Sequence, residues 1–361
     1  MKNILYIGRY NGIIGGIERY MQNSAELLRS NGCAVHYLYT ENGGREQEKF
    51  ASAFDSSAEF FPASSTIASA DVIIVHNIIP PELLKSLPED RTFFFAHDHN
   101  IYCRRHHYYT PVGRKNCHRA YNAMRCLICS LGRNPAPPLA EYRKLPALVL
   151  SDFMAENLRK NGFEQVIKLP AFIRTTEHDQ SFMPDGILRI LFLGQLIRGK
   201  GADLMLDALS RLEIPFTCTI AGDGNDRDML EDTVQKYGLT EQVKFCGFVS
   251  DTESLWRNCD VFCFPIRWQE PFGLVGLEAM AHGIPVVAFD RGGIREWLHD
   301  TRNGFAIPEY GNLETAISIL AQNPGNMLKQ MGEYGRKIAT EKFSEQCFLE
   351  KFASLLPEDT K

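Results

Sequence analysis

The sequence predicts an α/β protein made of two doubly wound, parallel-sheet domains of the Rossmann-like kind. Short apolar runs of strand length alternate with helix-compatible segments along most of the 361 residues. The runs are continuously apolar, which is typical of strands buried on both faces of a parallel sheet. The alternation stops at a polar stretch, residues 175–185, and then starts again. The predicted strands therefore fall into two sets.

The first set of predicted strands lies before that polar stretch. Its opening strand, residues 3–7, is followed by a glycine turn over residues 12–16 and then by a helix that reaches about Asn31. Glycine permits the tight turn that such a strand-to-helix connection needs. The remaining strands of this set are expected at residues 34–38, 71–75, 92–96, 145–150 and 166–169.

The second set begins at residues 188–193, and the tail from residue 323 onward has the pattern of an amphipathic helix. Its further strands are expected at residues 216–221, 243–245, 261–264 and 285–288. We therefore expect an N-terminal domain over residues 1–175 and a C-terminal domain over residues 186–342. A final helix over residues 343–361 is expected to return to the N-terminal domain. Ligands of doubly wound sheets bind outside the carboxyl ends of the strands, so we expect the site in a cleft between the domains.

Composition and charge exclude several classes of protein. With 44% hydrophobic and 23% charged residues, the chain is neither disordered nor collagen-like nor a coiled coil. The net charge is −5 and no RNA-binding motif is present, so we expect no nucleic-acid partner. No apolar run approaches the roughly 18 residues that span a bilayer. The apolar stretch at the N-terminus is too short for a signal peptide, so a cytoplasmic location is the default expectation.

Two glutamates carry the strongest chemical signal. Glu270 and Glu278 flank a predicted helix start, and Pro271 stands just inside it, where proline is favoured. Eight residues of helix rise by about 12 Å, so the two carboxylates can reach opposite ends of one extended ligand. The backbone N–H groups of the helix start between them suit an anion. A sugar, a diphosphate and a ribose have that layout; two solvated glutamates on a surface helix are the structural alternative.

A dinucleotide-binding site is the competing interpretation of the glycines. Gly222 and Gly224 follow a predicted strand and precede a helix, but Arg227 stands where a third glycine is expected. No acidic residue ends the next strand, where a ribose partner belongs. A nicotinamide-dependent enzyme is therefore disfavoured.

The motif and its surroundings resemble the retaining, nucleotide-sugar-dependent glycosyltransferases of family 4, which have the two-domain GT-B fold. Residues 270–278 and the following residues 281–288 are similar to the signature of that family. Further similar segments are residues 222–224, 243–247 and 292–296, and residues 15–19 at the N-terminal end. The resemblance covers nearly the full length and is strongest over residues 188–310.

The resemblance implies roles for residues of the C-terminal domain. Glu270 would hydrogen-bond hydroxyls of the donor sugar, and Glu278 would hold the nucleotide ribose. The backbone groups implied at the nucleotide diphosphate belong to Gly222, Phe272, Gly273 and Leu274. Lys200 matches the family lysine that neutralises the diphosphate, which gains negative charge as the sugar departs. The family's arginine is replaced by Gln195, and Arg198 would be its substitute.

The resemblance also implies roles in the N-terminal domain. Gly15 and Gly16 would let the first loop approach the phosphate closely. His97, with Asp98 as the second candidate, would face the reacting sugar; a histidine that caps a strand is the structural alternative. In the retaining reaction the departing phosphate oxygen is expected to take the acceptor's proton. No side-chain base is therefore required. The resemblance also implies that no catalytic metal is needed, as is the rule for enzymes of the GT-B fold.

Residues 97–135 are expected to form a cysteine-rich, basic insert in the N-terminal domain. Its four cysteines are Cys103, Cys117, Cys126 and Cys129. The last two have the spacing of a zinc knuckle, and clustered thiols in a reducing compartment suit a structural zinc better than disulfides. A metal would tie down a loop with little core of its own. Free thiols and disulfides are the alternatives, and His106, His107 or His118 could replace one cysteine as a ligand.

The same part of the chain is strongly basic. Nine basic residues and one acid give residues 101–145 a net charge of +8, against −5 for the whole chain. Docking onto an anionic membrane surface is one interpretation. Contact with a phosphorylated acceptor, such as a lipid diphosphate or a lipopolysaccharide core, is a second, and a solvated face is the structural alternative.

Taken together, the residues and the resemblance predict a retaining glycosyltransferase. It would transfer a hexose from a nucleotide sugar of the UDP, GDP or ADP type to a glycan or lipid-linked acceptor. Bacterial lipopolysaccharide, O-antigen or capsule synthesis is the expected setting, with peripheral contact at the inner face of the cell membrane. The alternative is a catalytically weak GT-B protein that serves as a scaffold or binding subunit, which Gln195 favours.

Overall fold

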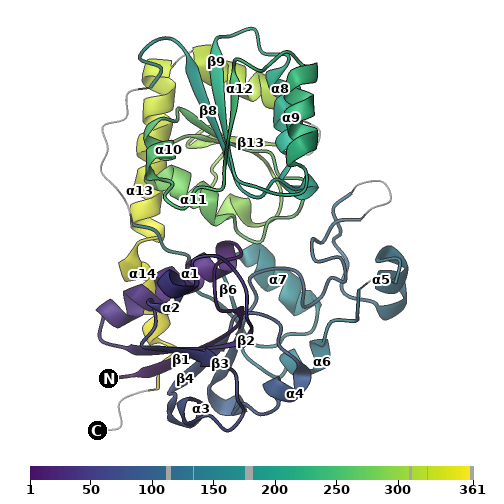
Figure 1. The fold of residues 1–361 in the computed structure, drawn as a ribbon, viewed down its shortest axis with the longest axis vertical. Helices are drawn as coiled ribbons and strands as arrows, with labels where there is room; N and C mark the ends of the chain where they lie inside the picture. Colours follow the sequence, from purple (N-terminus) through teal and green to yellow (C-terminus); the bar gives the residue numbers. More distant parts are fainter. Residues whose placement is uncertain (111–114, 133, 175–181, 309–310, 323, 358–361) are drawn as a thin grey trace. The chain divides into compact units, whose positions relative to one another are not determined.

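The computed structural model describes residues 1–110, 115–132, 134–174, 182–308, 311–322 and 324–357 (Figure 1). The chain divides into two compact units. The first contains Met1–Pro170 together with Glu345–Lys361, and the second contains Ala171–Ser344. Each unit is a parallel sheet with helices packed on it, so the predicted α/β class is confirmed.

The first unit has a seven-stranded parallel sheet in the order β3-β2-β1-β4-β5-β6-β7. Its strands are β1 (Asn3–Tyr10), β2 (Ala34–Glu41), β3 (Ser56–Glu59), β4 (Val72–Val75), β5 (Thr92–Phe95), β6 (Ala147–Val149) and β7 (Val166–Lys168). Strand β1 pairs with β2 on one side, Asn3 opposite Ala34, and with β4 on the other, Ile4 opposite Val72. The order in which successive strands are added therefore reverses beside β1, so the carboxyl ends of β1 and β4 form a switch point.

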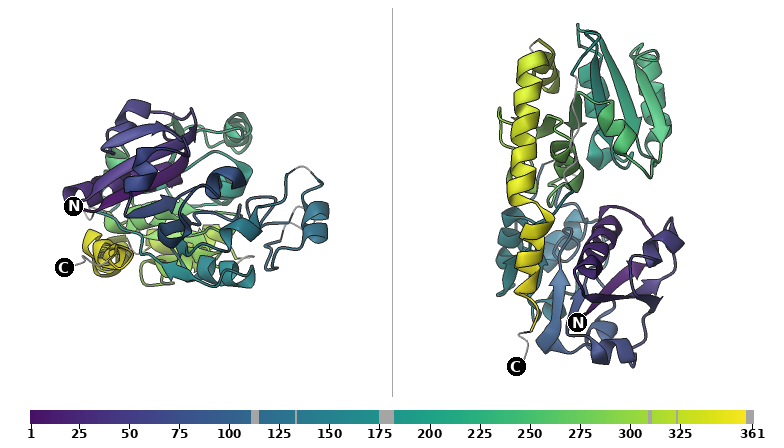
Figure 2. Two further views of the ribbon diagram at one scale, coloured as in Figure 1. Left: turned by 90° about the horizontal axis from the view of Figure 1, so that it is seen from below. Right: turned by 90° about the vertical axis from the view of Figure 1, so that its left-hand side faces the viewer.

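Helices surround this sheet, and the C-terminal one returns to it. They are α1 (Gly16–Ser30), α2 (Gln47–Ala51), α3 (Ser65–Ser69), α4 (Pro81–Leu84), η1 (Glu89–Arg91), α5 (Ala123–Cys129), α6 (Leu139–Tyr142), α7 (Asp152–Lys160) and α14 (Glu345–Ala353). Helix α14 belongs to this unit (Figure 2). Its Phe348 and Phe352 side chains are buried. The Lys2 ammonium donates to the Pro357 carbonyl oxygen at 2.8 Å, so the two ends of the chain meet in this unit.

The second unit has a six-stranded parallel sheet in the order β10-β9-β8-β11-β12-β13. Its strands are β8 (Leu188–Leu193), β9 (Phe216–Ala221), β10 (Val243–Gly247), β11 (Val261–Phe264), β12 (Val286–Phe289) and β13 (Gly304–Ile307). Its helices are η2 (Arg198–Lys200), α8 (Ala202–Leu209), α9 (Arg227–Lys236), α10 (Glu253–Arg257), α11 (Leu274–Ala281), η3 (Gly293–Glu296), α12 (Leu313–Gln322), η4 (Pro324–Leu328) and α13 (Lys329–Lys342). Strands β11 and β12 are buried at every residue, as their continuously apolar sequences predict.

The cysteine-rich insert is only partly independent of the core. Helix α5 lies away from the sheet at the end of an irregular segment (Figures 1 and 2). Tyr102 and Tyr108 from that segment are nevertheless 2% exposed and belong to the core of the first unit. Their rings meet edge to face with centroids 5.3 Å apart. These two tyrosine side chains therefore anchor the base of the insert.

Candidate functional site

In the second unit, residues that are predicted to bind the donor meet where the strand order reverses. Strands β8 and β11 are neighbours, and the loops that leave their carboxyl ends carry Lys200 and Glu270. The Lys200 ammonium donates to Glu270 Oε2 at 3.0 Å. Only 23% and 16% of these side chains are exposed, so the ion pair is largely shielded from water. This edge of a doubly wound sheet is where ligands bind.

The backbone of Glu270 is fixed by the glycine pair that follows β12. Glu270 and Gly292 form an isolated parallel bridge, and the Gly293 N–H donates to the Glu270 carbonyl oxygen at 2.7 Å. Gly292 has φ +72°, and a Cβ there would lie 2.2 Å from that oxygen. Only glycine fits at position 292. The loop therefore fixes the position of the Glu270 backbone, from which the side chain extends, at the edge of the sheet.

Helix α11 begins at Leu274, four residues after Glu270, at the same edge of the sheet. Its N-cap is Gly273, with φ +87°, and a Cβ there would press on the Phe264 ring at 3.1 Å. The Trp297 indole donates to the Phe272 carbonyl oxygen at 2.7 Å and holds the turn in place. The first N–H groups of a helix have no intrahelical partner, and they lie at its positive end. The backbone N–H groups of Phe272, Gly273 and Leu274, which are predicted to bind an anion, therefore lie at the start of one short helix.

Glu278 lies on the same helix, five residues into it. Its side chain is half-buried, and its carbonyl oxygen contacts the His282 ring, with Nδ1 at 2.8 Å. Glu270 precedes the helix and Glu278 lies within it. The prediction that eight residues of helix separate them, with Pro271 inside the helix start, is wrong, because the helix begins at Leu274 after the Gly273 N-cap.

The loop that carries Lys200 is packed tightly against the loop that carries Glu270. A Cβ at Gly199 would lie 1.6 Å from the Trp268 ring, so the backbone rests directly on that indole. Arg267, which was not identified from the sequence, donates to Asp203 Oδ2 at 2.6 Å and to the Arg198 carbonyl oxygen at 2.9 Å. The Arg198 side chain is 58% exposed and lies 3.5 Å from Asp203. Two arginines therefore share one aspartate beside Lys200.

Gly222 has a structural role at this edge. Its φ is +139°, and a Cβ there would lie 1.8 Å from the Gly194 carbonyl oxygen. Its N–H donates to the Gly247 carbonyl oxygen at 2.7 Å. Gly222 thus permits the loops after β8 and β9 to approach, and its predicted place at the nucleotide stays a prediction.

In the first unit, Gly15 and Gly16 begin helix α1 at the β1–β4 switch point. Glu18 Oε2 accepts from the Gly15 N–H at 2.9 Å, and burial raises the pKa of this carboxyl, which is 5% exposed. A Cβ at Gly16 would meet no described atom within 4 Å, so the backbone is open there. The first glycine loop thus offers an accessible helix start at the predicted phosphate position.

Asp98 closes the turn that follows β5. Its carboxylate accepts from the Asn100 backbone N–H at 2.9 Å and from the Asn100 amide at 2.8 Å. Burial raises the pKa of Asp98 to about 6, and the Glu18 carboxylate adds to the shift. Asp98 therefore has a local structural role beside the catalytic one that the resemblance implied.

His97 is held by a second histidine that sequence reasoning missed. His76 directly follows β4, is 2% exposed, and places its Nδ1 2.9 Å from His97 Nε2. The His97 ring also stacks on Phe95, with centroids 4.1 Å apart. Burial lowers the pKa of His97 to about 3 and lowers that of His76 as well, so both rings are neutral at pH 7. The signal was present: each histidine follows a predicted buried strand.

The burial of His76 assigns the tautomers. His76 Nε2 has no hydrogen-bond partner among the described residues. A buried N–H without an acceptor is rarer than a bare acceptor, so we assign the proton to His76 Nδ1, which donates to His97 Nε2. His97 then carries its own proton on Nδ1. His76 is a positioning residue that keeps His97 a neutral hydrogen-bond donor.

We expect neither histidine to become charged between pH 5 and 8. Free imidazoles titrate near about 6.5, so the unfolded chain binds these protons more readily than the folded one. Folding stability from this pair is therefore present above about pH 6.5 and declines as the pH falls toward the folded pKa. NMR of the imidazole rings, assigned with His76→Gln and His97→Gln variants, measures this. A midpoint near 6.5 for the His97 ring would contradict the assignment.

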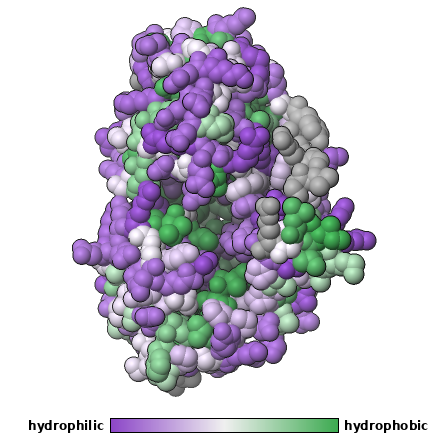
Figure 3. Space-filling view, turned by 45° about the vertical axis from the view of Figure 1, so that its right-hand side comes forward, coloured by the Kyte–Doolittle hydropathy of each residue, from purple (hydrophilic) through white to green (hydrophobic). Residues whose placement is uncertain are grey.

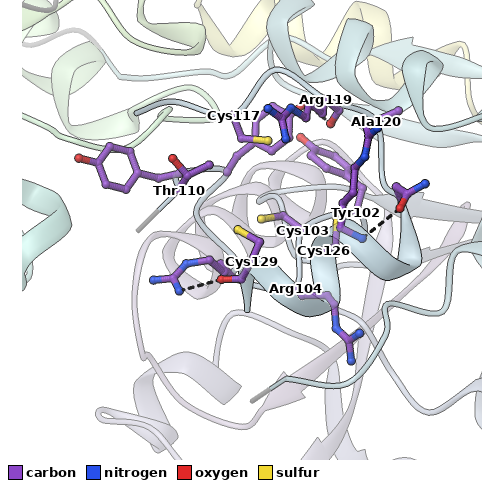
Figure 4. Close-up of a pocket in the computed structure, with 14 residues that line it drawn as sticks. Tyr102, Cys103, Arg104, Thr110, Cys117, Arg119, Ala120, Cys126 and Cys129 are labelled. Carbon is purple, nitrogen blue, oxygen red and sulfur yellow. Dashed lines mark hydrogen bonds between the residues drawn. The ribbon is translucent and has the colours of Figure 1, made fainter. Parts of the chain in front are cut away.

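The four cysteines of the insert line one cavity of about 80 Å³ (Figure 4). Burial raises the pKa of the Cys103 and Cys129 thiols, and the neighbouring Cys117 adds to both shifts. His106, His107 and His118 do not line the cavity. No group of three or more His, Cys, Asp or Glu side chains in the described chain is already arranged to hold a metal ion.

The family comparison concerns the second unit. Residues 173–338 match the family described as "Glycosyl transferases group 1". That span contains Lys200, Glu270 and Glu278. The match covers nearly all of the second unit, Ala171–Ser344.

Two curated relatives show how far the sequence similarity extends. The chain is 40% identical over 119 residues to an uncharacterized glycosyltransferase of Methanocaldococcus jannaschii, covering 32% of this chain and 30% of that protein. It is 29% identical over 171 residues to the lipopolysaccharide core biosynthesis glycosyltransferase LpsE of Rhizobium meliloti, covering 46% and 49%. The chain thus spans less than half the length of these relatives.

Among solved structures, the chain resembles Anabaena HepE in complex with UDP. The TM-score is 0.73 at 19% identity, over 98% of this chain and 99% of that one. It also resembles WaaG, described as a glycosyltransferase involved in lipopolysaccharide biosynthesis, with a TM-score of 0.69 at 18% identity, over 98% and 100%. The two-sheet architecture is therefore of the predicted GT-B class.

Proposed function

We propose that this protein is a retaining glycosyltransferase that transfers a hexose from a nucleotide sugar to a glycan or lipid-linked acceptor. The observation that carries the proposal is the Lys200–Glu270 ion pair, held between the switch point of the second sheet and the start of helix α11. A cation, a carboxylate and a helix N-terminus in one place match a sugar diphosphate group by group. The names of LpsE and WaaG support a setting in bacterial lipopolysaccharide, O-antigen or capsule synthesis.

We propose that the bound donor breaks the Lys200–Glu270 ion pair and that each of the two side chains then contacts the donor. Its diphosphate takes Lys200 and the first N–H groups of α11, and Gly222 and Arg198 flank the nucleotide. Release from Lys200 leaves the Glu270 carboxylate to accept from hydroxyls of the sugar. Glu278, further along the helix, accepts from the ribose hydroxyls. Each of these contacts involves a charged partner and so is stronger than a neutral hydrogen bond.

The transfer itself needs no side-chain base. The bond between the anomeric carbon and the phosphate oxygen breaks, and its electron pair stays on the diphosphate, which Lys200 stabilises. The acceptor oxygen bonds to the anomeric carbon on the same face, and its proton passes to the departing phosphate oxygen. His97 serves as a neutral donor to a sugar hydroxyl, and Gly15 and Gly16 approach the phosphate.

The first unit is proposed to bind the acceptor. Its basic segment, residues 101–145, suits phosphate groups, either on the acceptor or on lipid headgroups at the inner face of the cell membrane. Among the described residues no helix is long and apolar enough to cross a membrane, so any such contact is peripheral. A catalytically weak scaffold is the second candidate, because Gln195 stands where the family has arginine.

A thermal-shift screen against UDP, GDP and ADP tests the nucleotide part of the proposal. A ligand at 100 times its dissociation constant adds about 2.7 kcal/mol to the free energy of unfolding. We expect one of the three to raise the melting temperature. A chain that none of them stabilises would contradict the proposal.

We further propose that Cys103, Cys117, Cys126 and Cys129 hold one structural zinc. Four thiols on the wall of one small cavity fit the tetrahedral sulfur site that zinc prefers. Because no three of the described side chains already stand at ligand spacing, binding must draw the sulfurs inward. The ion would tie helix α5 to the segments that carry Cys103 and Cys117.

Metal analysis of the purified protein is expected to find about one zinc per chain. The Cys126→Ser/Cys129→Ser double variant should lose it, whereas the control Cys33→Ser, outside the insert, should keep it. Four freely titrating thiols in a protein without metal would rule the site out.

A further inference from the structure

Helix α5 exposes an apolar face to solvent. Met124, Leu127, Ile128 and Leu131 are 73%, 44%, 69% and 68% exposed. Met124, Leu127 and Ile128 have the spacing i, i+3 and i+4, which places them along one side of the helix. Leu131 follows the end of the helix, with φ +54°. We call these four residues the α5 tip. Figure 3 shows an apolar patch on this side of the molecule.

The opposite side of the same helix faces inward. Cys126 and Cys129 are only partly exposed and line the cavity of the insert. An amphipathic helix normally turns its apolar side to the core, whereas α5 turns its thiols inward and its apolar side outward. Single exposed apolar side chains are common, but four that are contiguous mark an interaction surface.

The charge around the tip indicates what covers it. Arg119 and Arg125 are exposed, whereas Arg104 and Arg105 are half-buried and donate to the carbonyl oxygens of Asn134 and Cys129. The chain carries no acidic residue between Asp98 and Glu141, so these cations have no counter-ion from their own segment. The covering surface must therefore be apolar where the tip meets it and anionic around the rim.

An anionic bilayer has that layering, because its acyl chains lie beneath a layer of phosphates. A folded protein partner fits less well. A stable interface buries about 800 Å² on each side, far more than four side chains on a seven-residue helix provide.

We propose that the α5 tip inserts into the headgroup region of an anionic membrane, with the surrounding arginines on lipid phosphates. The inference rests on and deepens the peripheral membrane contact proposed above, and it depends on no donor and on no residue of the second unit. It assigns the cysteine-rich insert a function: a projecting, metal-tied arm that holds the acceptor-binding unit at a lipid surface.

The test is sedimentation of the full-length protein with vesicles of phosphatidylcholine alone or mixed with phosphatidylglycerol. We expect binding to the anionic vesicles only, weakened by salt. The Ile128→Ser/Leu131→Ser variant should lose at least about tenfold in partition coefficient, because each buried methylene contributes about 0.8 kcal/mol. The control Phe61→Ser/Met229→Ser removes two exposed apolar side chains elsewhere and should bind as the wild type does.

Several outcomes would overturn the inference. They are absence of wild-type binding to anionic vesicles at low salt, or equal partition of the tip variant and the control. A concentration-dependent dimer that the tip variant abolishes would instead make the face a contact between copies. Circular dichroism and nucleotide-induced thermal stabilisation of the tip variant report its folding. A protein that binds vesicles but no nucleotide would leave this inference standing while the transferase proposal fails.

Discussion

Lys200→Ala is expected to lower turnover by roughly 10²–10³-fold, the usual effect of removing one preorganised group that stabilises a developing anion. The Lys200 ammonium is fixed by Glu270 at 3.0 Å and lies 5.7 Å from the centre of the Phe264 ring. Because the diphosphate gains charge as the sugar leaves, we expect a smaller effect on nucleotide affinity than on kcat. Steady-state kinetics with the donor identified by screening measure both.

Two variants separate this role from simple loss of charge. Lys337→Ala removes a 65% exposed lysine from helix α13 and should leave kcat unchanged. Glu270→Gln breaks the same ion pair but keeps the lysine, so it should raise the KM for the donor while the diphosphate remains neutralised. Equal kcat for Lys200→Ala and the wild type would remove Lys200 from the chemistry.

Glu278→Ala is expected to weaken nucleotide binding by roughly 10–100-fold. A hydrogen bond to a charged group is worth about 1.5–3 kcal/mol, and each 1.4 kcal/mol is about tenfold in affinity. Titration calorimetry with the free nucleoside diphosphate measures the loss. The matched control is Glu333→Ala, on the exposed side of helix α13. Unchanged affinity in Glu278→Ala would refute the ribose contact.

Much of the fold was predictable because continuous apolar runs identify buried parallel strands. The two strands that the pattern missed lie at sheet edges. Strand β3 (Ser56–Glu59) contains no large apolar residue, and its side chains are mostly exposed. Strand β13 (Gly304–Ile307) is only four residues long and begins at a glycine with φ +149°. Strand β3 thus lacks the apolar residues that the pattern detects, whereas β13, although mostly buried, is a short apolar run beside a glycine.

The convergence of Lys200 and Glu270 was also predictable, since both follow strands that a doubly wound order brings together. The role of His76 was missed although the residue follows a predicted strand. A single histidine after a strand is most often structural, and only the 2.9 Å contact with His97 distinguishes this one. Arg267 was also missed, because its role is visible only from its hydrogen bond to Asp203 in the structure.

The cysteine-rich insert shows a different limit. The cysteine spacing indicated a metal site, and the apolar spacing of the α5 tip was equally present in the sequence. Periodicity identifies one side of a helix but not what that side faces. Only the structure shows that the thiols turn inward and the apolar side chains outward.

The most direct test of the transferase proposal is turnover of a panel of UDP-, GDP- and ADP-hexoses by the purified protein. We predict release of one nucleoside diphosphate, faster with a suitable acceptor, and a product whose anomeric configuration by NMR equals that of the donor. Lys200→Ala should abolish most of the release. No release from any donor, in a protein that nevertheless binds a partner tightly, would contradict the proposal and favour a scaffold.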